Sequence, residues 1–468
     1  MHDCRQAAMT GTAPAKSSFV RDLRTVLAGS GFRKLYTTRL ISQTGDGIFT
    51  AGLGAYVFFN AQTYPNPAAA AVSFAVLYLP YSLIGPFAGV FIDRWSRRQI
   101  MLWSASLRGS FAALTAMLIW SGTLGPPIWL CALVVLGVNR FFLSALSAAL
   151  PHVVVHDELV MANSVGPTSG TVMGFVGAFI GVALHSVTSG GAGGSAITLL
   201  LAGVCYLLAG LSATRMARDA LGPDRPAGPE SGGLAAEIRS AAAGLRTVAI
   251  GLVAGLRHAW HRPHARAALA AIAAHRFLYG ILALMTILLY RNYFYAGSSG
   301  NASLWHFASV GISSGIGYGL AAVITPVATG RMAAVTWITA LLAAGGVVTG
   351  ALGISFHPLG FVVIGFALGL VAQGITICTT TILQREMADD FRGRVFSIND
   401  MLYNGTFALG AAICAVFVPV TGKSALLLVV AACGYLAAAA GYWIMAGQPR
   451  PGSPAAGRPA ASAQSSSS

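Results

Sequence analysis

The sequence contains few charged side chains. Asp, Glu, Lys and Arg make up 9% of its 468 residues, whereas they make up about 25% of an ordinary soluble domain. So few charges cannot cover the surface of a soluble protein of this length, and much of that surface must therefore contact lipid. The 56 glycines fit this interpretation, because small residues let membrane helices approach one another closely.

Cysteine pairs and catalytic motifs are also missing. The six cysteines form no CxxC pair, which argues against a disulfide framework or a zinc site. We find no HExxH pair, no GxSxG elbow and no catalytic cysteine–histidine arrangement. The segment 421–424 (TGKS) resembles the end of a phosphate loop, but Phe417 stands where its first glycine should be. These absences predict a protein without metal or cofactor, and they argue against a membrane-embedded enzyme or an ATP-driven pump.

Long apolar runs make up most of the chain. A membrane-spanning helix needs about 20 mostly apolar residues, and a helix is required because the backbone polar groups of each span must pair within it. Residues 1–31 lack the apolar region of a cleavable signal peptide, so we expect the first run to act as the insertion signal. Twelve runs are long enough to span a membrane: 33–60, 68–92, 99–121, 127–150, 161–186, 195–213, 265–291, 303–329, 332–354, 357–383, 395–420 and 424–446.

The longest connection between these runs divides the chain into two halves. It lies at 214–264 and predicts a cytoplasmic linker between six-helix bundles at 32–213 and 265–446. Residues 1–31 are expected to form a cytoplasmic N-terminal segment, and the Pro-, Ala- and Ser-rich tail at 447–468 is predicted to be disordered. The predicted fold class is all-α integral membrane, with twelve transmembrane helices in two six-helix bundles.

The linker itself contains a helix-like pattern. Apolar residues recur at helical spacing at Ile238, Leu245, Leu252 and Leu256, with charged residues among them. This pattern predicts either an amphipathic helix on the inner membrane surface or an ordinary solvated linker helix. The sequence alone leaves both possibilities open.

Basic residues, nearly all of them arginine, gather in alternate connections between the runs. If both termini lie in the cytoplasm, the cytoplasmic segments hold 23 of the 29 basic residues, and the outside loops hold only Arg291 and Lys423. This distribution predicts a multi-pass protein of the inner (plasma) membrane, and the arginine bias hints at a bacterial source. The net charge of +15 therefore reflects membrane topology and not a nucleic-acid partner.

The connection between the second and third runs carries the most specific motif. Residues 89–98 read GVFIDRWSRR, which resembles the GxxxDRxxRR loop signature of the major facilitator superfamily, with Ser96 in place of a glycine. In that family the acidic residue approaches the start of the eleventh helix, and the basic residues latch the two halves together on the cytoplasmic side. The resemblance implies a conformational latch, to which we assign Gly89, Asp93, Arg94, Arg97, Arg98, Arg108 and Asp400.

Two further segments resemble one branch of this superfamily. The start of the first helix (32–47, FRKLYTTRLISQTGDG) and the connection after the tenth (384–397, QREMADDFRGRVFS) are similar to macrolide-efflux proteins and the enterobactin exporter. The resemblance covers residues 32–446. Drug antiporters often have a proline in helix five where this chain has Ala178. The resemblance therefore supports the fold more strongly than it supports antiport.

The resemblance also implies that helices one, four, seven and ten surround a central cavity. The polar residues of these helices recur at spacings that place them on one face of each helix, as expected of a shared aqueous path. The candidates for substrate binding or proton coupling are Arg39, Gln43 and Asp46 in helix one, Arg140 in helix four, His275 and Arg276 in helix seven, and Gln373, Thr376 and Thr380 in helix ten.

Asp46 is the strongest of these candidates. It lies 13 residues into the first run, which is about 20 Å along a helix and close to the membrane midplane. An isolated carboxylate there costs about 2.5–3.5 kcal/mol on insertion scales, so we expect Asp46 to couple protons or to pair with a cationic substrate. The other possibility is a static ion pair, with Arg140 as the expected partner. His275 likewise either titrates or packs between helices.

Together these features predict a proton-coupled exporter of hydrophobic or amphiphilic small molecules, such as a drug, an antibiotic or a siderophore-like compound. It would work as a monomer by alternating access, with the proton gradient as its energy source. A lysolipid or metabolite carrier of the same fold, including an importer, is the alternative, because the residues do not reveal direction. A receptor-like membrane protein would need neither the loop motif nor four polar helices.

Overall fold

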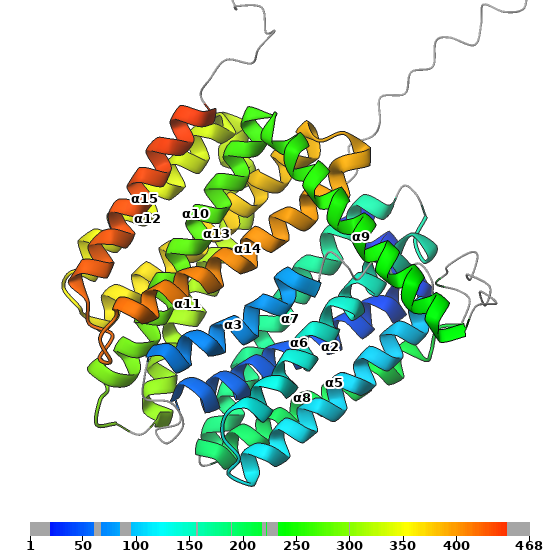
Figure 1. The fold of residues 1–468 in the computed structure, drawn as a ribbon, viewed down its shortest axis with the longest axis horizontal. Helices are drawn as coiled ribbons and strands as arrows, with labels where there is room; N and C mark the ends of the chain where they lie inside the picture. The colour runs from blue at the N-terminus through cyan, green and yellow to red at the C-terminus, as the bar shows by residue number, and fades with distance from the viewer. Residues whose placement is uncertain are drawn as a thin grey trace, which may run out of the picture.

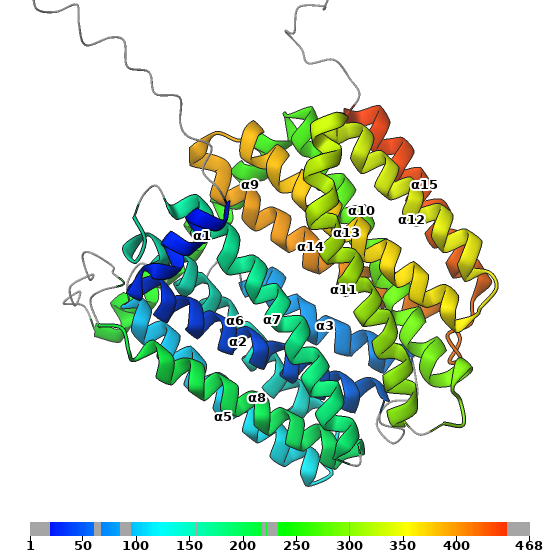
Figure 2. The same ribbon diagram turned by 180° about the vertical axis from the view of Figure 1, so that it is seen from behind.

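The computed structural model describes residues 19–59, 67–84, 95–155, 158–188, 190–217, 221, 233–298 and 300–446. These residues are helical and contain no strand, and their long helices form two groups that lie side by side (Figures 1 and 2). The first group consists of α2 (Ser30–Gly54), α3 (Pro67–Ile84), α5 (Arg97–Trp120), α6 (Pro126–Ala149), α7 (Leu159–Val187) and α8 (Gly191–Ala213). The second consists of α10 (Pro263–Leu289), α11 (Gly300–Arg331), α12 (Ala334–Gly353), α13 (Pro358–Glu386), α14 (Asp389–Phe417) and α15 (Ala425–Ala446).

Shorter elements extend or connect these helices. The π-helices η1 (Ala55–Phe59) and η5 (Tyr290–Phe294) continue α2 and α10, and the 3₁₀ turn η3 (Leu150–His152) continues α6. Two helices, α1 (Phe19–Ala28) and α9 (Gly233–Trp260), precede the first and second groups. The predicted all-α fold of twelve helices in two bundles is therefore confirmed.

Most of these helices can cross a membrane. Among the described residues, ten helices are long and apolar enough to do so, and α2 and α3 complete the twelve. Helix α2 is less apolar than its neighbours because it carries charged residues such as Arg39 and Asp46. Each of the twelve helices coincides with one of the apolar runs that the sequence predicts.

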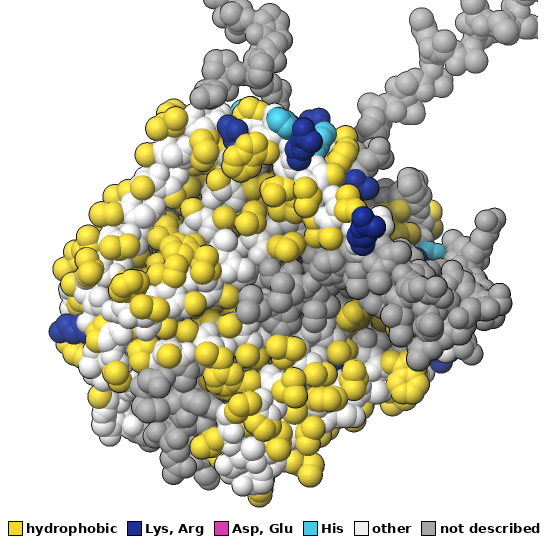
Figure 3. Space-filling model, in the orientation of Figure 1, with side chains coloured by type: hydrophobic (Ala, Val, Ile, Leu, Met, Phe, Trp, Pro, Cys, Tyr) yellow, Lys and Arg dark blue, Asp and Glu magenta, His cyan; other side chains and the backbone are white. Residues whose placement is uncertain are grey.

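The outer surface of the two bundles is apolar, as lipid requires. Large side chains such as Trp103, Met117, Val323 and Val416 are exposed on helices of both bundles. Figure 3 shows apolar side chains scattered over the described parts of one face, while most of the basic side chains in view gather at the end that α9 crosses. We call this the basic end; α5 begins there and α11 ends there.

Glycines let particular helix pairs come into backbone contact inside each bundle. A Cβ added at Gly47 of α2 would lie 2.0 Å from the carbonyl oxygen of Gly174 in α7. A Cβ added at Gly280 of α10 would lie 2.1 Å from the carbonyl oxygen of Phe407 in α14. Because no side chain fits at either position, the two bundles repeat the same close helix pairing.

The bundles contact each other chiefly through α3 and α14, whose aromatic rings interleave. The ring of Phe407 on α14 lies 4.4 Å from that of Tyr78 and 5.4 Å from that of Phe74, both on α3. Away from the basic end, the ring of Phe59 in η1 lies 5.3 Å from that of Phe307 in α11. The interface between the bundles is therefore aromatic and largely free of ion pairs among the described residues.

Helix α9 occupies the connection between the bundles and crosses the basic end of both (Figure 1). Its Gly255 packs against Arg394 of α14, and the ring of His258 stacks on Phe391 at 4.4 Å. The opposite side of α9 exposes apolar side chains, including Val253 and Trp260. This pattern is compatible with a position on the membrane surface, which stays a prediction. Residues 1–18 and 447–468 lie outside the described residues.

Candidate substrate and coupling site

Asp46 lies inside the first bundle and is held by residues from three other helices. Its carboxylate forms an ion pair with Arg108 of α5. It also accepts hydrogen bonds from the amide of Asn139 on α6 at 3.2 Å and from the hydroxyl of Tyr206 on α8 at 3.1 Å. We call these four residues the Asp46 cluster. The carboxylate side chain is 20% exposed, whereas Arg108 is fully buried, so the acid is the accessible member of the pair.

Arg108 keeps other contacts besides the ion pair. One terminal nitrogen donates to the hydroxyl of Ser42 at 2.9 Å. Its guanidinium lies 3.8 Å from the ring centre of Tyr206 and 5.6 Å from that of Phe142, positions that favour cation–π attraction. Arg108 therefore keeps one hydrogen bond and two ring contacts when Asp46 is protonated and the ion pair is lost.

Two sequence predictions need correction here. Arg140 was the expected partner of Asp46, but the ion pair is formed by Arg108. Arg140 lies at a depth in the membrane similar to that of Asp46, but depth does not determine which way a side chain points around the helix axis. Arg108 was assigned to the latch, yet α5 buries it within the first bundle. Arg140 lies on α6 and Asp400 on α14, and within the described chain these two residues form no ion pair with each other.

The second bundle contains a neutral counterpart of this cluster. The hydroxyl of Tyr435 on α15 lies 3.1 Å from Nδ1 of His275 on α10, and His275 is fully buried. The ring of Tyr279 stacks on His275 at 5.8 Å. Tyr206 and Asp46 are 160 residues apart in the chain, and so are Tyr435 and His275. The tyrosine contact is therefore repeated, with imidazole in place of carboxylate.

Arg276, the neighbour of His275, is surrounded by aromatic rings. Its Nε donates to the carbonyl oxygen of Tyr403 on α14 at 2.9 Å. The guanidinium carbon lies 3.9 Å from the ring centre of Tyr403, 4.5 Å from that of Phe407 and 5.5 Å from that of Tyr279. We call these four residues the Arg276 cluster. Because Phe407 also touches α3, the cluster lies where the two bundles meet.

The remaining polar candidates make local contacts. Arg39 donates through Nε to the side-chain oxygen of Gln43 at 3.1 Å. On α13, Thr376 and Thr380 donate to carbonyl oxygens of their own helix, and the side-chain oxygen of Gln373 is buried with no donor among the described groups. The structure thus brings Asp46 together with Arg108, while the hydrogen bonds of Thr376 and Thr380 stay within α13.

The two latch arginines at the start of α5 contact their own bundle. Gly89, Asp93 and Arg94 lie outside the described residues. Arg97 donates to the carbonyl oxygen of Leu221 at 2.9 Å, and Arg98 donates to that of Thr214 at 3.4 Å. Both contacts fix the start of α5 against the end of α8 and the chain that follows it. A latch between the bundles therefore stays a prediction.

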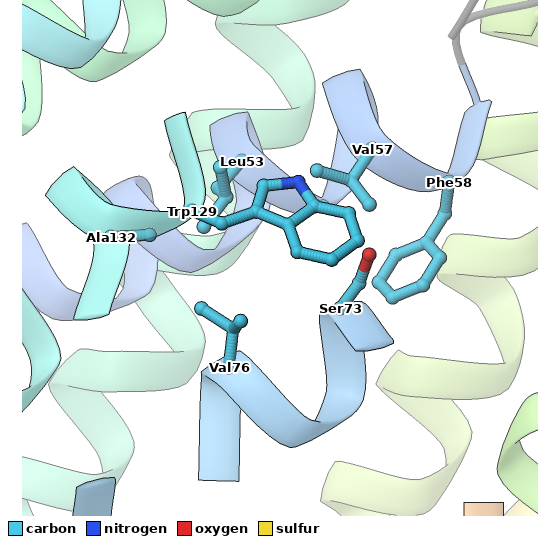
Figure 4. A pocket seen from close by; sticks show the side chains of 8 residues that line it. Leu53, Val57, Phe58, Ser73, Val76, Trp129 and Ala132 are labelled. Carbon is cyan, nitrogen blue, oxygen red and sulfur yellow. The ribbon is translucent and has the colours of Figure 1, made fainter. Parts of the chain in front are cut away.

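A small apolar pocket lies between η1, the end of α2, α3 and α6. Leu53, Val57, Phe58 and Trp129 point into it, together with the hydroxyl of Ser73 (Figure 4). Its cavity volume is about 10 Å³, which is enough for about one water molecule. The pocket is too small for a transported compound.

Comparison with known proteins identifies the family. A model of the Major Facilitator Superfamily matches residues 35–411. The chain belongs to the major facilitator superfamily. Two curated relatives, described as uncharacterised MFS-type transporters of Mycobacterium tuberculosis and Mycobacterium bovis, are each 34% identical over 438 residues, covering 93% of this chain and 95% of theirs.

Solved structures of major facilitator proteins share the fold. The nucleoside transporter NupG has a TM-score of 0.60 at 14% identity, covering 89% of this chain and 99% of its own. A peptide transporter POT in complex with sulfate has a TM-score of 0.64 at 12% identity, covering 91% and 98%. An inward-facing, unoccupied bacterial homologue of the lysosomal transporter Spinster has a TM-score of 0.58 at 14%, covering 91% and 98%. At these identities the likeness extends to the fold alone.

Membership of the superfamily confirms the broad sequence prediction. This major facilitator protein is a multi-span membrane transporter and not an enzyme, and it binds a small-molecule substrate in a lipid bilayer. The finer resemblance to macrolide-efflux proteins and the enterobactin exporter is not confirmed by these relatives. That branch assignment therefore stays a prediction.

The sequence interpretation missed the tyrosines and Asn139. Tyr206 and Tyr435 stand in apolar runs, where a tyrosine reads as an ordinary packing residue. Asn139 directly precedes Arg140 in α6, and an amide within an apolar helix is a signal that could have been used. The equal spacing from Asp46 to Tyr206 and from His275 to Tyr435 was a second available signal.

Proposed function

We propose that this chain is a proton-coupled secondary transporter that exports hydrophobic or amphiphilic small molecules by alternating access. The observation that carries the proposal is the ion pair between Asp46 and Arg108 inside membrane-spanning helices. Ionisable groups in such helices are costly and usually functional. Asp46 is the member of this pair that a proton can reach, because only its side chain is exposed.

The surroundings of Asp46 support two alternative states of the pair. When Asp46 is ionised, Arg108, Asn139 and Tyr206 hold α2, α5, α6 and α8 together through one carboxylate. Leaving a charge of a buried pair without its partner costs about 3–5 kcal/mol. A proton on Asp46 removes the negative charge, and Arg108 retains the hydroxyl of Ser42 and the ring of Tyr206. Proton binding would therefore loosen the packing of α2 against its neighbours.

The contact between the bundles supports alternating access. In this mechanism one bundle rocks against the other around a central site. Rings such as Tyr78 and Phe407 can slide and repack without breaking an ion pair. Protonation of Asp46 would therefore change access to the substrate site through movement at this interface.

The distribution of basic residues supports a plasma-membrane protein with both termini in the cytoplasm. Arg97 and Arg98 begin α5, and Arg331 ends α11, all at the basic end that α9 crosses. Basic residues are retained on the cytoplasmic side during insertion. The bacterial relatives are consistent with a bacterial inner membrane, and a monomer is the form we propose.

Transport in cells tests this proposal. The chain is expressed in a bacterial host stripped of its own efflux pumps, and accumulation of a panel of dyes and antibiotics is followed with and without a protonophore. We expect lower accumulation of at least one compound, restored to the control level by the protonophore. We expect Asp46→Asn to abolish the effect, because the amide keeps the size of the carboxylate but binds no proton near neutral pH.

A matched variant removes a different carboxylate. Glu158→Gln changes a partly exposed acid at the start of α7, outside both clusters, and should transport normally. Protonophore-sensitive efflux that persists in Asp46→Asn at normal protein levels would refute the coupling role. If no compound changes while the protein is present in the membrane, the lysolipid or metabolite carrier becomes the better description, and uptake into proteoliposomes is the next measurement.

A further inference from the structure

Arg276 is a buried cation without an acidic partner among the residues that the structure describes. It is 5% exposed. Within the described ranges the ion pair inside the bundles is that of Asp46 and Arg108. The position equivalent to Asp46 in the second bundle is His275, which is bonded to Tyr435. The positive charge of Arg276 is therefore not neutralised by these parts of the protein.

The terminal nitrogens of Arg276 are available to a ligand. Only its Nε has a hydrogen-bond acceptor among the described groups, the carbonyl oxygen of Tyr403. The terminal nitrogens are not among the fully buried polar atoms without a partner, although the residue as a whole is 5% exposed. Two parallel N–H groups of a guanidinium match the two oxygens of a carboxylate or phosphate. The side chain is thus oriented through its Nε, and its terminal nitrogens have no acceptor among the described groups.

The rings around Arg276 come from several helices and reach both bundles. Tyr403 and Phe407 lie on α14 and Tyr279 on α10. The ring of Phe407 in turn lies 4.4 Å from that of Tyr78 on α3, in the first bundle. A ligand bound here would place an apolar or aromatic body against these rings. It would also lie beside surfaces that move when the bundles rock.

The rest of the predicted path is also richer in cations than in acids. Arg39 on α2 has only the Gln43 amide as a side-chain partner within the described chain. Membrane helices place charge in the interior at high cost. Arginines without acidic partners therefore favour an anionic ligand over a cationic one.

We propose that Arg276 binds the anionic headgroup of the substrate, and that the substrate is an amphiphile bearing a carboxylate or phosphate on an apolar body. The headgroup would pair with the terminal nitrogens of Arg276, and the body would pack on Tyr279, Tyr403 and Phe407. This inference rests on the proposed transport function and narrows its substrate class.

Binding to the purified full-length protein in detergent tests the inference. The probes share one fluorophore and differ in charge: dansylglycine carries a carboxylate, the dansyl amide of phosphoethanolamine a phosphate, dansylamide no charge and dansylcadaverine a cation. Energy transfer from tryptophan reports binding. We expect one or both anionic probes to bind at least about 10-fold more tightly than dansylamide, the scale of a charge-assisted hydrogen-bond pair, and dansylcadaverine to bind most weakly. The tighter of the two anions distinguishes carboxylate from phosphate.

Variants assign this preference to Arg276. We expect Arg276→Gln to weaken the anionic probes about 10- to 100-fold and to leave dansylamide unchanged. Arg276→Lys keeps the charge but loses the planar fork, so it should lose about 10-fold. Arg331→Gln removes an exposed arginine from the end of α11 and should bind all probes like the unmodified chain.

Several results would overturn the inference. Equal affinities for all four probes, or no measurable binding of any, would refute an anion site. An anion preference that survives Arg276→Gln would place the site elsewhere. If Arg276→Gln does not fold, the preference of the unmodified chain and the Arg276→Lys variant still decide the question. The binding assay needs no proton gradient, so it is independent of the transport assay. Anion binding without protonophore-sensitive flux would refute proton coupling alone. Protonophore-sensitive flux without anion binding would refute the anion site alone.

Discussion

The two bundles share a geometry and differ in charge. In the first, Tyr206 of α8 donates to Asp46 of α2, and Arg108 of α5 lies over the tyrosine ring. In the second, Tyr435 of α15 contacts His275 of α10, and Gly345 of α12 lies beside the tyrosine ring where the arginine would be. An ion pair in one bundle has thus become a neutral contact in the other.

This difference indicates a division of labour between the bundles. The first bundle carries its own counter-ion, so its chemistry is that of a proton-sensitive pair. The second bundle carries Arg276 among aromatic rings with no acidic partner in the described chain. An arginine that the protein pairs with its own carboxylate suits proton coupling, whereas an arginine without an acidic partner in the described chain suits binding of a ligand. Repeats in transporters keep the same helix packing while their sites diverge.

The largest predicted effect breaks the ion pair. Arg108→Met leaves the partly buried Asp46 carboxylate with only Asn139 and Tyr206, and we expect a loss of about 3 kcal/mol in stability, the lower end of the range for a buried pair. Arg276→Met leaves no carboxylate without a partner. It should lower stability by less than about 2 kcal/mol, the contribution of the cation–π contacts and one hydrogen bond of Arg276. Thermal unfolding in detergent measures both.

A rescue experiment accompanies these variants. Adding Asp46→Asn to Arg108→Met removes the abandoned charge and should recover part of the lost stability. Equal losses for Arg108→Met and Arg276→Met would show that the two bundles do not differ in charge as the structure indicates.

The next effect tests whether the packing of the two bundles is symmetric. Gly47→Ala and Gly280→Ala each place a Cβ about 2 Å from a carbonyl oxygen of the facing helix. Backbone cannot move aside as a side chain does, so we expect each variant to lose about 3 kcal/mol, the upper part of the usual range for overpacking. Gly319→Ala meets nothing within 4 Å and should be neutral. Unequal losses of stability in the Gly47 and Gly280 variants, measured as unfolding temperatures, would contradict a helix pairing that is repeated in both bundles.

The fold could be predicted from the sequence because one property decides it. An apolar run of sufficient length in lipid has to become a helix, and each predicted run coincides with an observed helix. The linker likewise contains α9 where the sequence shows helical spacing. None of these predictions required knowledge of which helices are neighbours.

The partners within the site depend on neighbours and could not be predicted in the same way. Asp46 and Arg276 were identified because charge is rare in apolar helices. The pairing of Asp46 with Arg108 and not Arg140 depends on how α5 and α6 are rotated about their axes. The hydrogen bond from Tyr206 to Asp46 could not be predicted either, because a tyrosine in an apolar run is often only a packing residue.

The smallest predicted effect compares the two tyrosines directly. Tyr206→Phe removes a hydrogen bond to a carboxylate, and Tyr435→Phe removes a hydrogen bond with an imidazole that has no carboxylate beside it among the described residues. Hydrogen bonds to charged groups contribute about 1.5–3 kcal/mol, against about 0.5–1.5 kcal/mol between neutral groups. Tyr206→Phe should therefore lower the unfolding temperature more than Tyr435→Phe.

The same pair separates coupling from packing. Loss of the Tyr206 hydroxyl leaves the carboxylate with two partners and should make Asp46 easier to protonate, so proton-driven efflux should shift toward higher pH. Tyr435→Phe lies in the bundle without a carboxylate and should leave the pH profile unchanged. A shift of equal size in both variants would mean that proton coupling is shared between the bundles, and that His275 takes part in it together with Asp46.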